Sequence, residues 1–153
     1  MKNAIILCSG GLDSVVTAHY VRKKLKYDKI TILFFNYWQK SYLTEIRCAN
    51  KCASDLHGEF KEIKLNELER LSASLINVKG NFKKLNRKDL KNTKKESKKW
   101  YVPCRNLIFL SFALALSESE FVKNKKKNDI FVGFKNEGKE SFPDTTKEFI
   151  ELM

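Results

Sequence analysis

The chain has 153 residues, of which 42% are hydrophobic and 12% aromatic, so it has enough apolar material for one folded domain and is not a disordered polymer. Its six glycines, two prolines and four cysteines exclude collagen-like, low-complexity and disulfide-dense classes. Thirty basic residues against 18 acidic ones give a formal net charge of +12, a balance that favours anionic ligands.

The first predicted elements are a strand and a helix. Residues 4–8 form a short, wholly apolar run, which is typical of a strand inside a parallel sheet. Residues 13–26 follow with apolar residues at helical spacing, and we expect Val16, Tyr20 and Leu25 on the apolar side of this helix. The alternation continues with strands predicted at residues 30–36, 60–65 and 129–134, and helices at 43–56, 66–74, 106–120 and from about Thr146 to the end.

Two of the later helices carry specific packing predictions. The helix at 43–56 is expected to bury Ile46, Ala49 and Ala53. The helix at 106–120 is apolar almost all round, and a helix of that kind is expected to be buried on all sides.

The order of elements predicts the fold class. Strands separated by helices imply parallel pairing with right-handed crossovers. We therefore predict an α/β fold, a Rossmann-like parallel sheet of four or five strands with helices on both faces, in one domain that spans residues 1–153. A ligand is expected at the carboxyl ends of the strands.

No apolar run approaches the roughly 18 residues of a membrane-spanning helix; the longest candidate is Leu107 to Leu116. The apolar run at the N-terminus ends at Cys8 and has neither the length nor the cleavage site of a signal peptide. The sequence therefore predicts a cytoplasmic protein without a membrane partner.

The positive charge is concentrated in one stretch. Residues 79–99 hold ten basic and two acidic residues, which contribute +8 of the +12. We interpret residues 78–99 as a solvated, mobile loop or extension. A nucleic-acid contact through 79–99 is the alternative, less favoured because the lysines are interrupted by a single aromatic residue, Phe82, before Trp100.

The four cysteines form no Cys-x-x-Cys motif, and neither histidine is spaced with them as a zinc ligand would be. The sequence therefore does not support a zinc site. Cys48 and Cys52 lie four residues apart on a predicted helix, so they share a face, and we expect both to be small buried hydrophobic residues.

The most informative string is SGGLDS at residues 9–14, which follows the first strand and opens the first helix. Backbone N–H groups converge at such a turn, and the helix dipole favours an anion there. The two glycines allow a phosphate close to the backbone, the two serines offer hydroxyl donors, and Asp13 can cap the helix and help to hold Mg²⁺. The string is neither a Walker A loop nor G-x-G-x-x-G. The alternative is an ordinary glycine-rich turn with Asp13 as the N-cap, but the full string in this context predicts pyrophosphate binding.

The string resembles the pyrophosphate loop of the ATP pyrophosphatases, which cleave ATP between the α- and β-phosphates and transfer AMP to a substrate oxygen. Three further stretches narrow the resemblance: FNYWQK at 35–40, VPCRNLIFLS at 102–111, and Gly133 followed by FPD at 142–144 and Glu148-Phe149. In this order and spacing the motifs look like those of the 7-cyano-7-deazaguanine (preQ0) synthase family, whose pattern reads SGGxDS, F-x-Y-x-Q, V-P-G-R-N-x-x-F-L-S and G…YPD…EF. The resemblance covers the whole chain apart from the basic stretch.

The resemblance implies an adenine nucleotide alpha-hydrolase-like fold and an ATP-dependent carbon–nitrogen ligase that uses ATP and Mg²⁺. The carboxylate of 7-carboxy-7-deazaguanine would attack the α-phosphate, and ammonia would then displace AMP to give the amide. A second ATP would activate the amide oxygen, and loss of AMP would leave the nitrile, a precursor of queuosine and archaeosine.

The family pattern also implies the site residues. Arg105 opens a helix, where a cation is disfavoured unless it meets an anion; a surface salt bridge is the alternative. Asn106 can cap that helix, and Asp144 can either hydrogen-bond a purine-like ring or be a plain turn carboxylate. The implied catalytic residues are Asp13 and Arg105; the ATP-binding residues are Cys8, Ser9, Gly10, Gly11, Leu12, Asp13 and Ser14; the substrate-binding residues are Tyr37, Gln39, Arg105, Asn106, Gly133 and Asp144.

Several departures from the family pattern keep other functions open. The family carries a four-cysteine zinc site near its C-terminus, beyond the region that matches this chain. Cys104 replaces the family's glycine, Gly138 its acidic residue and Phe142 its tyrosine. The alternatives are AMP transfer to another substrate such as tRNA or a protein, and a non-catalytic nucleotide-binding relative. A homodimer also stays open.

Overall fold

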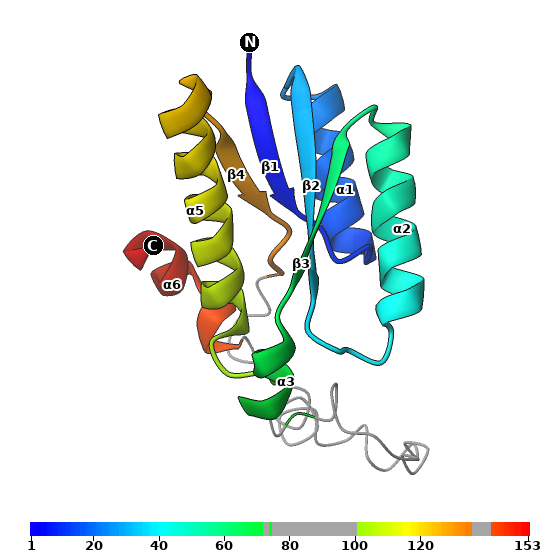
Figure 1. Ribbon diagram of the computed structural model, residues 1–153, viewed down its shortest axis with the longest axis vertical. Helices are drawn as coiled ribbons and strands as arrows, with labels where there is room; N and C mark the ends of the chain where they lie inside the picture. The colour runs from blue at the N-terminus through cyan, green and yellow to red at the C-terminus, as the bar shows by residue number, and fades with distance from the viewer. Residues whose placement is uncertain (72–73, 75–100, 136–141) are drawn as a thin grey trace.

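The computed structural model describes residues 1–71, 74, 101–135 and 142–153, and the basic stretch lies outside them. Within these residues the centre is an all-parallel sheet of four strands in the order β3-β2-β1-β4 (Figure 1). This confirms the predicted α/β class. The strands are β1 (Asn3–Leu7), β2 (Lys29–Asn36), β3 (Glu59–Lys64) and β4 (Asp129–Val132).

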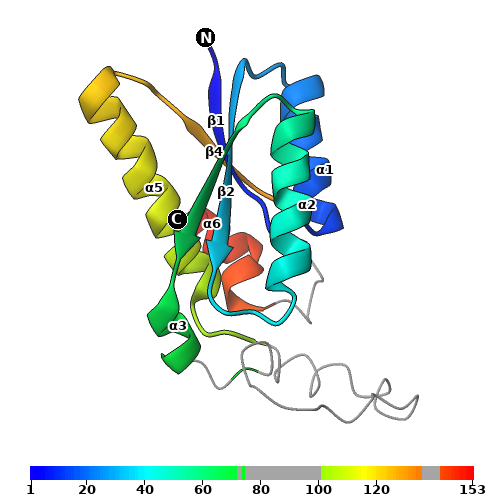
Figure 2. The same ribbon diagram turned by 45° about the vertical axis from the view of Figure 1, so that its right-hand side comes forward.

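Helices cover both faces of the sheet, as predicted. Figures 1 and 2 show α1 and α2 on one face and α5 and α6 on the other, with α3 beyond the carboxyl end of β3. The helices are α1 (Leu12–Lys23), α2 (Tyr42–Asp55), α3 (Asn66–Leu71), α5 (Arg105–Asn124) and α6 (Lys147–Leu152), and a 3-10 turn, η3, spans Pro143–Thr145.

The two central strands are buried along all but their first residue because both of their faces are covered. Ile6, Ile32 and Phe34 pack in the core under α1 and α2. Leu33 and Phe35, which alternate with them, pack in a second core under α5. Each strand therefore contributes to two hydrophobic cores, one on each side of the sheet.

The predicted apolar face of α1 is wrong. Val16 and Tyr20 are 57% and 54% exposed, and the helix instead buries Ser14, Ala18 and Val21. Small residues on the inner face let the helix lie close to the sheet, so the larger apolar residues point outward. The helix ends at Lys23, and Leu25 packs on the core from the turn that follows.

Burial of α5 on all sides is also wrong. Leu110 and Ala113 are buried, but Leu114 is 50% and Val122 65% exposed. Among the described residues this helix lies against the sheet on one side, so the opposite side keeps its apolar residues at the surface. The helix also runs four residues past the predicted end, to Asn124.

In α2 the prediction is confirmed for Ala49 and Ala53, which are buried, and for Ile46, which packs on the core. Cys52 is buried as expected, but Cys48 is exposed. Cys48 lies one helical turn before Cys52, where the helix faces the loop after β1 rather than the core. Of the helices in the described part of the chain, none is long and apolar enough to cross a bilayer.

Candidate active site

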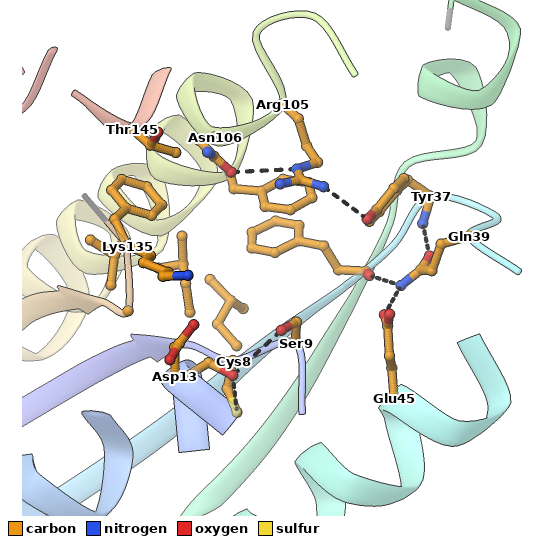
Figure 3. Close-up of a pocket in the computed structure, with 18 of the residues that line it drawn as sticks. Cys8, Ser9, Asp13, Tyr37, Gln39, Glu45, Arg105, Asn106, Lys135 and Thr145 are labelled. Atoms are coloured by element: carbon orange, nitrogen blue, oxygen red, sulfur yellow. Dashed lines mark hydrogen bonds between the residues drawn. The ribbon is translucent and has the colours of Figure 1, made fainter. Parts of the chain in front are cut away.

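A cavity of about 460 Å³ opens at the carboxyl ends of β1, β2 and β4, where a parallel sheet is expected to bind its ligand (Figure 3). Its floor is apolar, and Phe35 and Phe109 stack there with ring centroids 4.1 Å apart. Its polar lining residues are Ser9, Asp13, Ser14, Gln39, Ser41, Glu45, Arg105, Asn106, Lys135 and Thr145.

The loop between β1 and α1 has its shape because of Gly10. This residue adopts a positive φ of 78°, and a Cβ on it would lie 2.5 Å from the Glu45 carbonyl oxygen and 2.8 Å from Cys48 Cβ. Both the backbone conformation and the space therefore require glycine. The loop thus lies directly against the first turns of α2.

The first turn of α1 differs from the capping prediction. Its N-cap is Gly11, not Asp13, and no side chain caps the helix. Asp13 lies in the first turn with its carboxylate directed into the cavity (Figure 3). The two serines flank the turn: Ser14 Oγ donates to the Gly11 carbonyl oxygen at 2.9 Å and lies 3.4 Å from Ser9 Oγ. The carboxylate is therefore available to a ligand rather than used by the helix.

Cys8 forms the cavity wall beneath this loop and contacts Cys52 of α2. The contact with the Cys52 thiol lowers the pKa of the Cys8 thiol to about 6; burial opposes the change, and Ser14 and the Gly10 N–H support it. Sharing of a proton with Cys8, together with burial, raises the pKa of Cys52. Both groups lie behind the loop.

A hydrogen-bonded chain lines the wall between β2 and α2 (Figure 3). The buried amide of Gln39 accepts from the Tyr37 N–H at 3.0 Å and donates to the Phe35 carbonyl oxygen at 3.0 Å and to Glu45 Oε2 at 2.9 Å. Every polar atom of this amide has a partner, so Gln39 holds the Glu45 carboxylate in place.

Arg105 lies on the far wall of the cavity from the loop (Figure 3). Its Nη1 donates to Tyr37 Oη at 3.3 Å, and its guanidinium lies 5.9 Å from the ring centroids of both Tyr37 and Phe109. Burial raises the pKa of Tyr37, with Arg105 acting in the opposite direction, so the phenol is neutral at physiological pH. The cation is thus positioned by aromatic groups.

Asp144 caps α5, a role that we assigned to Asn106. The Asn106 N–H donates to Asp144 Oδ2 at 2.9 Å, and Asn106 Nδ2 donates to the Asp144 carbonyl oxygen at 3.2 Å. Asp144 is 6% exposed and does not line the cavity. Its carboxylate instead accepts the open N–H of Asn106 in the first turn of the helix.

Two of the departures from the family pattern lie within the described residues. Cys104 is the residue before α5 and has a positive φ of 55°, a conformation in which glycine has no steric cost. Phe142 stacks on Tyr101, with ring centroids 5.3 Å apart. Gly138 lies outside the described residues.

The structure brings most of the predicted site residues to one cavity. Gly10 and Gly11 shape the loop without lining the cavity, and Leu12 points to solvent. Lining residues that we did not predict include Ser41, Glu45, Phe109 and Lys135. A signal for Lys135 existed, because it follows the carboxyl end of a predicted strand. The predicted residues that do line the cavity are Cys8, Ser9, Asp13, Ser14, Tyr37, Gln39, Arg105, Asn106 and Gly133.

A magnesium ion carried by ATP would meet suitable donors here. The Asp13 carboxylate and the Ser9 hydroxyl are hard oxygen ligands at the loop, and phosphate oxygens complete such a site. Within the described ranges no three His, Cys, Asp or Glu side chains group to hold a metal ion by themselves.

The chain has a parallel sheet, a glycine-tipped loop at the head of the first helix, and a cavity that the loop shares with the ends of three strands. This is an α/β fold consistent with the ATP pyrophosphatase type. Comparison with known families agrees, since the model described as "Queuosine biosynthesis protein QueC" matches residues 3–153. The chain belongs to the QueC family.

Curated relatives carry one name. The chain is 33% identical to the 7-cyano-7-deazaguanine synthase of Pyrococcus horikoshii, in an alignment that covers 100% of this chain and 63% of the relative. It is 38% identical to the enzyme of that name from Methanococcus maripaludis, over 97% of this chain and 61% of the relative. A Nitratiruptor relative of the same name is 33% identical, in an alignment that covers 98% of this chain and 63% of the relative. The chain spans about three fifths of the length of the curated relatives it matches.

Proposed function

We propose that this chain is the ATP- and substrate-binding domain of a 7-cyano-7-deazaguanine synthase, an ATP-dependent carbon–nitrogen ligase. One observation carries the proposal: a single cavity presents a phosphate-binding type of loop on one wall and Arg105 on the other, with a stacked aromatic floor between them. The family membership and the name shared by its relatives support the same substrate class.

The loop residues would hold the nucleotide. The N–H groups at the head of α1 and the hydroxyls of Ser9 and Ser14 face the polyphosphate, with Cys8 and Leu12 as neighbours in the loop. Magnesium bound with ATP would neutralise phosphate charge, and the Asp13 carboxylate would ligate it. Pre-arranged donors of this kind stabilise the charge that develops on the departing pyrophosphate.

The opposite wall would hold the acid. Arg105 can pair with the carboxylate of the 7-deazapurine and direct one oxygen at the α-phosphorus. The phenol of Tyr37, with Gly133 at the end of β4, would complete the substrate contacts, and the Gln39 amide would act as a positioning group that holds this wall. Asn106 would face the ligand from the start of α5, and Asp144 would act as a positioning residue that holds this start in place.

The reaction then needs no side-chain nucleophile. Attack by the carboxylate expels pyrophosphate and leaves an acyl-adenylate, and ammonia displaces AMP to form the amide. A second ATP adenylates the amide oxygen, and departure of AMP with loss of the amide protons gives the nitrile. We place this chemistry in the cytoplasm, where thiols stay reduced; the four cysteines of the chain are unpaired.

The test is incubation of the purified protein with 7-carboxy-7-deazaguanine, ammonium and Mg·ATP, followed by liquid chromatography with mass detection. We expect AMP, pyrophosphate and the nitrile, and a large loss of all three in Arg105→Gln. AMP release with another acid but not with this one would contradict the substrate. ATP binding without AMP release for any acid would indicate a nucleotide-binding module.

A further inference from the structure

Lys135 is a cation of the cavity that neither the sequence motifs nor the family name assigns. It lies three residues beyond the end of β4, which is the edge strand that pairs with β1. Its side chain lines the same cavity as Ser9 and Asp13. The question is what a cation does at this wall.

The end of β4 is held against the head of α1. A Cβ on Gly133 would lie 2.9 Å from the Asp13 carbonyl oxygen and 3.0 Å from the Ser14 nitrogen, so the two backbones are in direct contact. Lys135 follows two residues later. In Figure 3 its ammonium group points into the cavity on the side of Asp13, whereas Arg105 lies on the far wall.

A cation at this wall would offset the negative charges that a bound nucleotide would bring there. A polyphosphate at the head of α1 would bring several negative charges close to the Asp13 carboxylate, and like charges in a partly enclosed site repel strongly. Among the described residues that line the cavity, two are cationic, Arg105 and Lys135. Arg105 is positioned by Tyr37 and Phe109 at the opposite side. Lys135 is therefore the cation on the phosphate side.

We propose that Lys135 binds the β- and γ-phosphates of the nucleotide at this loop, an inference that rests on the proposed function. When the bond between the α-phosphorus and the bridging oxygen breaks, the electron pair goes to the pyrophosphate. The ammonium group stays protonated and offsets the added charge, and no proton is transferred. Lysine is a compact point charge well suited to phosphate oxygens.

The experiment measures binding by calorimetry in the full chain, with pyrophosphate, Mg·ATP and AMP as separate ligands. Lys135→Met should weaken the binding of pyrophosphate and of Mg·ATP by roughly tenfold or more, as loss of a charge-assisted hydrogen bond predicts. AMP lacks the β- and γ-phosphates, so its affinity should change far less. Lys135→Arg keeps the charge and should recover most of the affinity.

Lys29→Met is the matched control. Lys29 is exposed at the first residue of β2, at the opposite end of the strands, and its loss changes the net charge equally. This control should bind all three ligands like the unaltered protein, and equal melting temperatures would show that the variants are folded. Unchanged pyrophosphate and ATP affinity in Lys135→Met would overturn the inference and leave the proposed function standing. An equal loss of AMP affinity in Lys135→Met would also overturn the inference, because the effect would then not depend on the β- and γ-phosphates. No binding of any nucleotide by the unaltered protein would refute both.

Discussion

Cys104 carries local backbone strain beside the described part of the site. It holds a left-handed φ of 55° at the residue before α5, where its side chain makes no capping hydrogen bond. A residue with a Cβ is disfavoured in this conformation by about 1–2 kcal/mol, and glycine is not. The cysteine therefore contributes strain without a compensating contact.

We predict that Cys104→Gly raises the free energy of unfolding by about 1 kcal/mol, part of the gain being offset by the greater freedom of glycine in the unfolded chain. Urea denaturation measures the change. Cys104→Ala serves as the control, because alanine keeps the Cβ and should give no comparable gain. Equal stabilisation by both substitutions would show that removal of the thiol, rather than relief of the backbone, is the cause.

At the residue scale, the candidate site residues that could be predicted from the sequence are those that lie close together along the chain. The six residues of the loop could be assigned because glycines, serines and Asp13 are contiguous. The bond between Asn106 and Asp144 could not, because 38 residues separate them and either could have faced a ligand. Glu45 was missed for a similar reason, since its orientation depends on the buried amide of Gln39.

At the scale of elements, the type and order of the elements were predictable, but several helix ends and the buried faces of two helices were not. The outer side of α5 is apolar in sequence, so its periodicity gives no sign of which residues are covered. In α1 the burial of Ala18 beside exposed Tyr20 reverses the usual size preference. One-sided cover by the sheet decided the first case and close packing on the sheet the second, and no residue pattern within one helix records either.

The turn from α5 to β4 depends on Glu120. Its carboxylate accepts from Lys126 Nζ at 2.8 Å and from Asn128 Nδ2 at 2.8 Å. Burial works to raise the pKa of Glu120, but these two hydrogen bonds outweigh it and lower the pKa below the ordinary value of 4.5. A depressed carboxyl pKa means that the contribution to stability is full above about pH 4.5 and is lost as the pH falls through the lower, folded-state value.

We predict that Glu120→Gln lowers the free energy of unfolding by about 1–2 kcal/mol at pH 7, and that the difference from the unaltered protein shrinks toward pH 3. Denaturant melts across this pH range measure it. Glu151→Gln removes one partner of the exposed Lys147–Glu151 pair and should change stability by less than about 0.5 kcal/mol. A difference for Glu120→Gln that persists unchanged at pH 3 would contradict the ionic explanation.

For the whole molecule, the dominant electrostatic quantity is the net charge of +12. Self-repulsion of this size destabilises a compact state, and salt screens it over about 10 Å at 0.1 M. The opposing contribution comes from exposed ion pairs such as Lys51–Asp55 and Arg70–Glu67, which are worth little individually. Screening of the repulsion should therefore outweigh the loss of these pairs.

We predict that the melting temperature rises by roughly 2–4 °C between 0.05 and 0.5 M NaCl, the equivalent of about 1 kcal/mol for a chain of this size. Differential scanning calorimetry without nucleotide measures the change, and potassium chloride should give the same result if screening is the cause. A fall in melting temperature with salt would show that the ion pairs outweigh the net charge.

Gly10 and Gly133 have no side chain with which to bind a ligand, yet each leaves room for a neighbouring backbone segment that a Cβ would displace. Alanine at either position would push the loop away from α2 or the end of β4 away from α1, and the cavity wall formed by these segments would shift with it. An exhaustive mutational survey would therefore rank these two positions with the polar side chains of the cavity, although neither glycine has a side chain to contribute. Intolerance to substitution in this domain will reflect the fit between its backbone segments as much as the roles of its cavity side chains, and only binding measurements on each variant can separate the two.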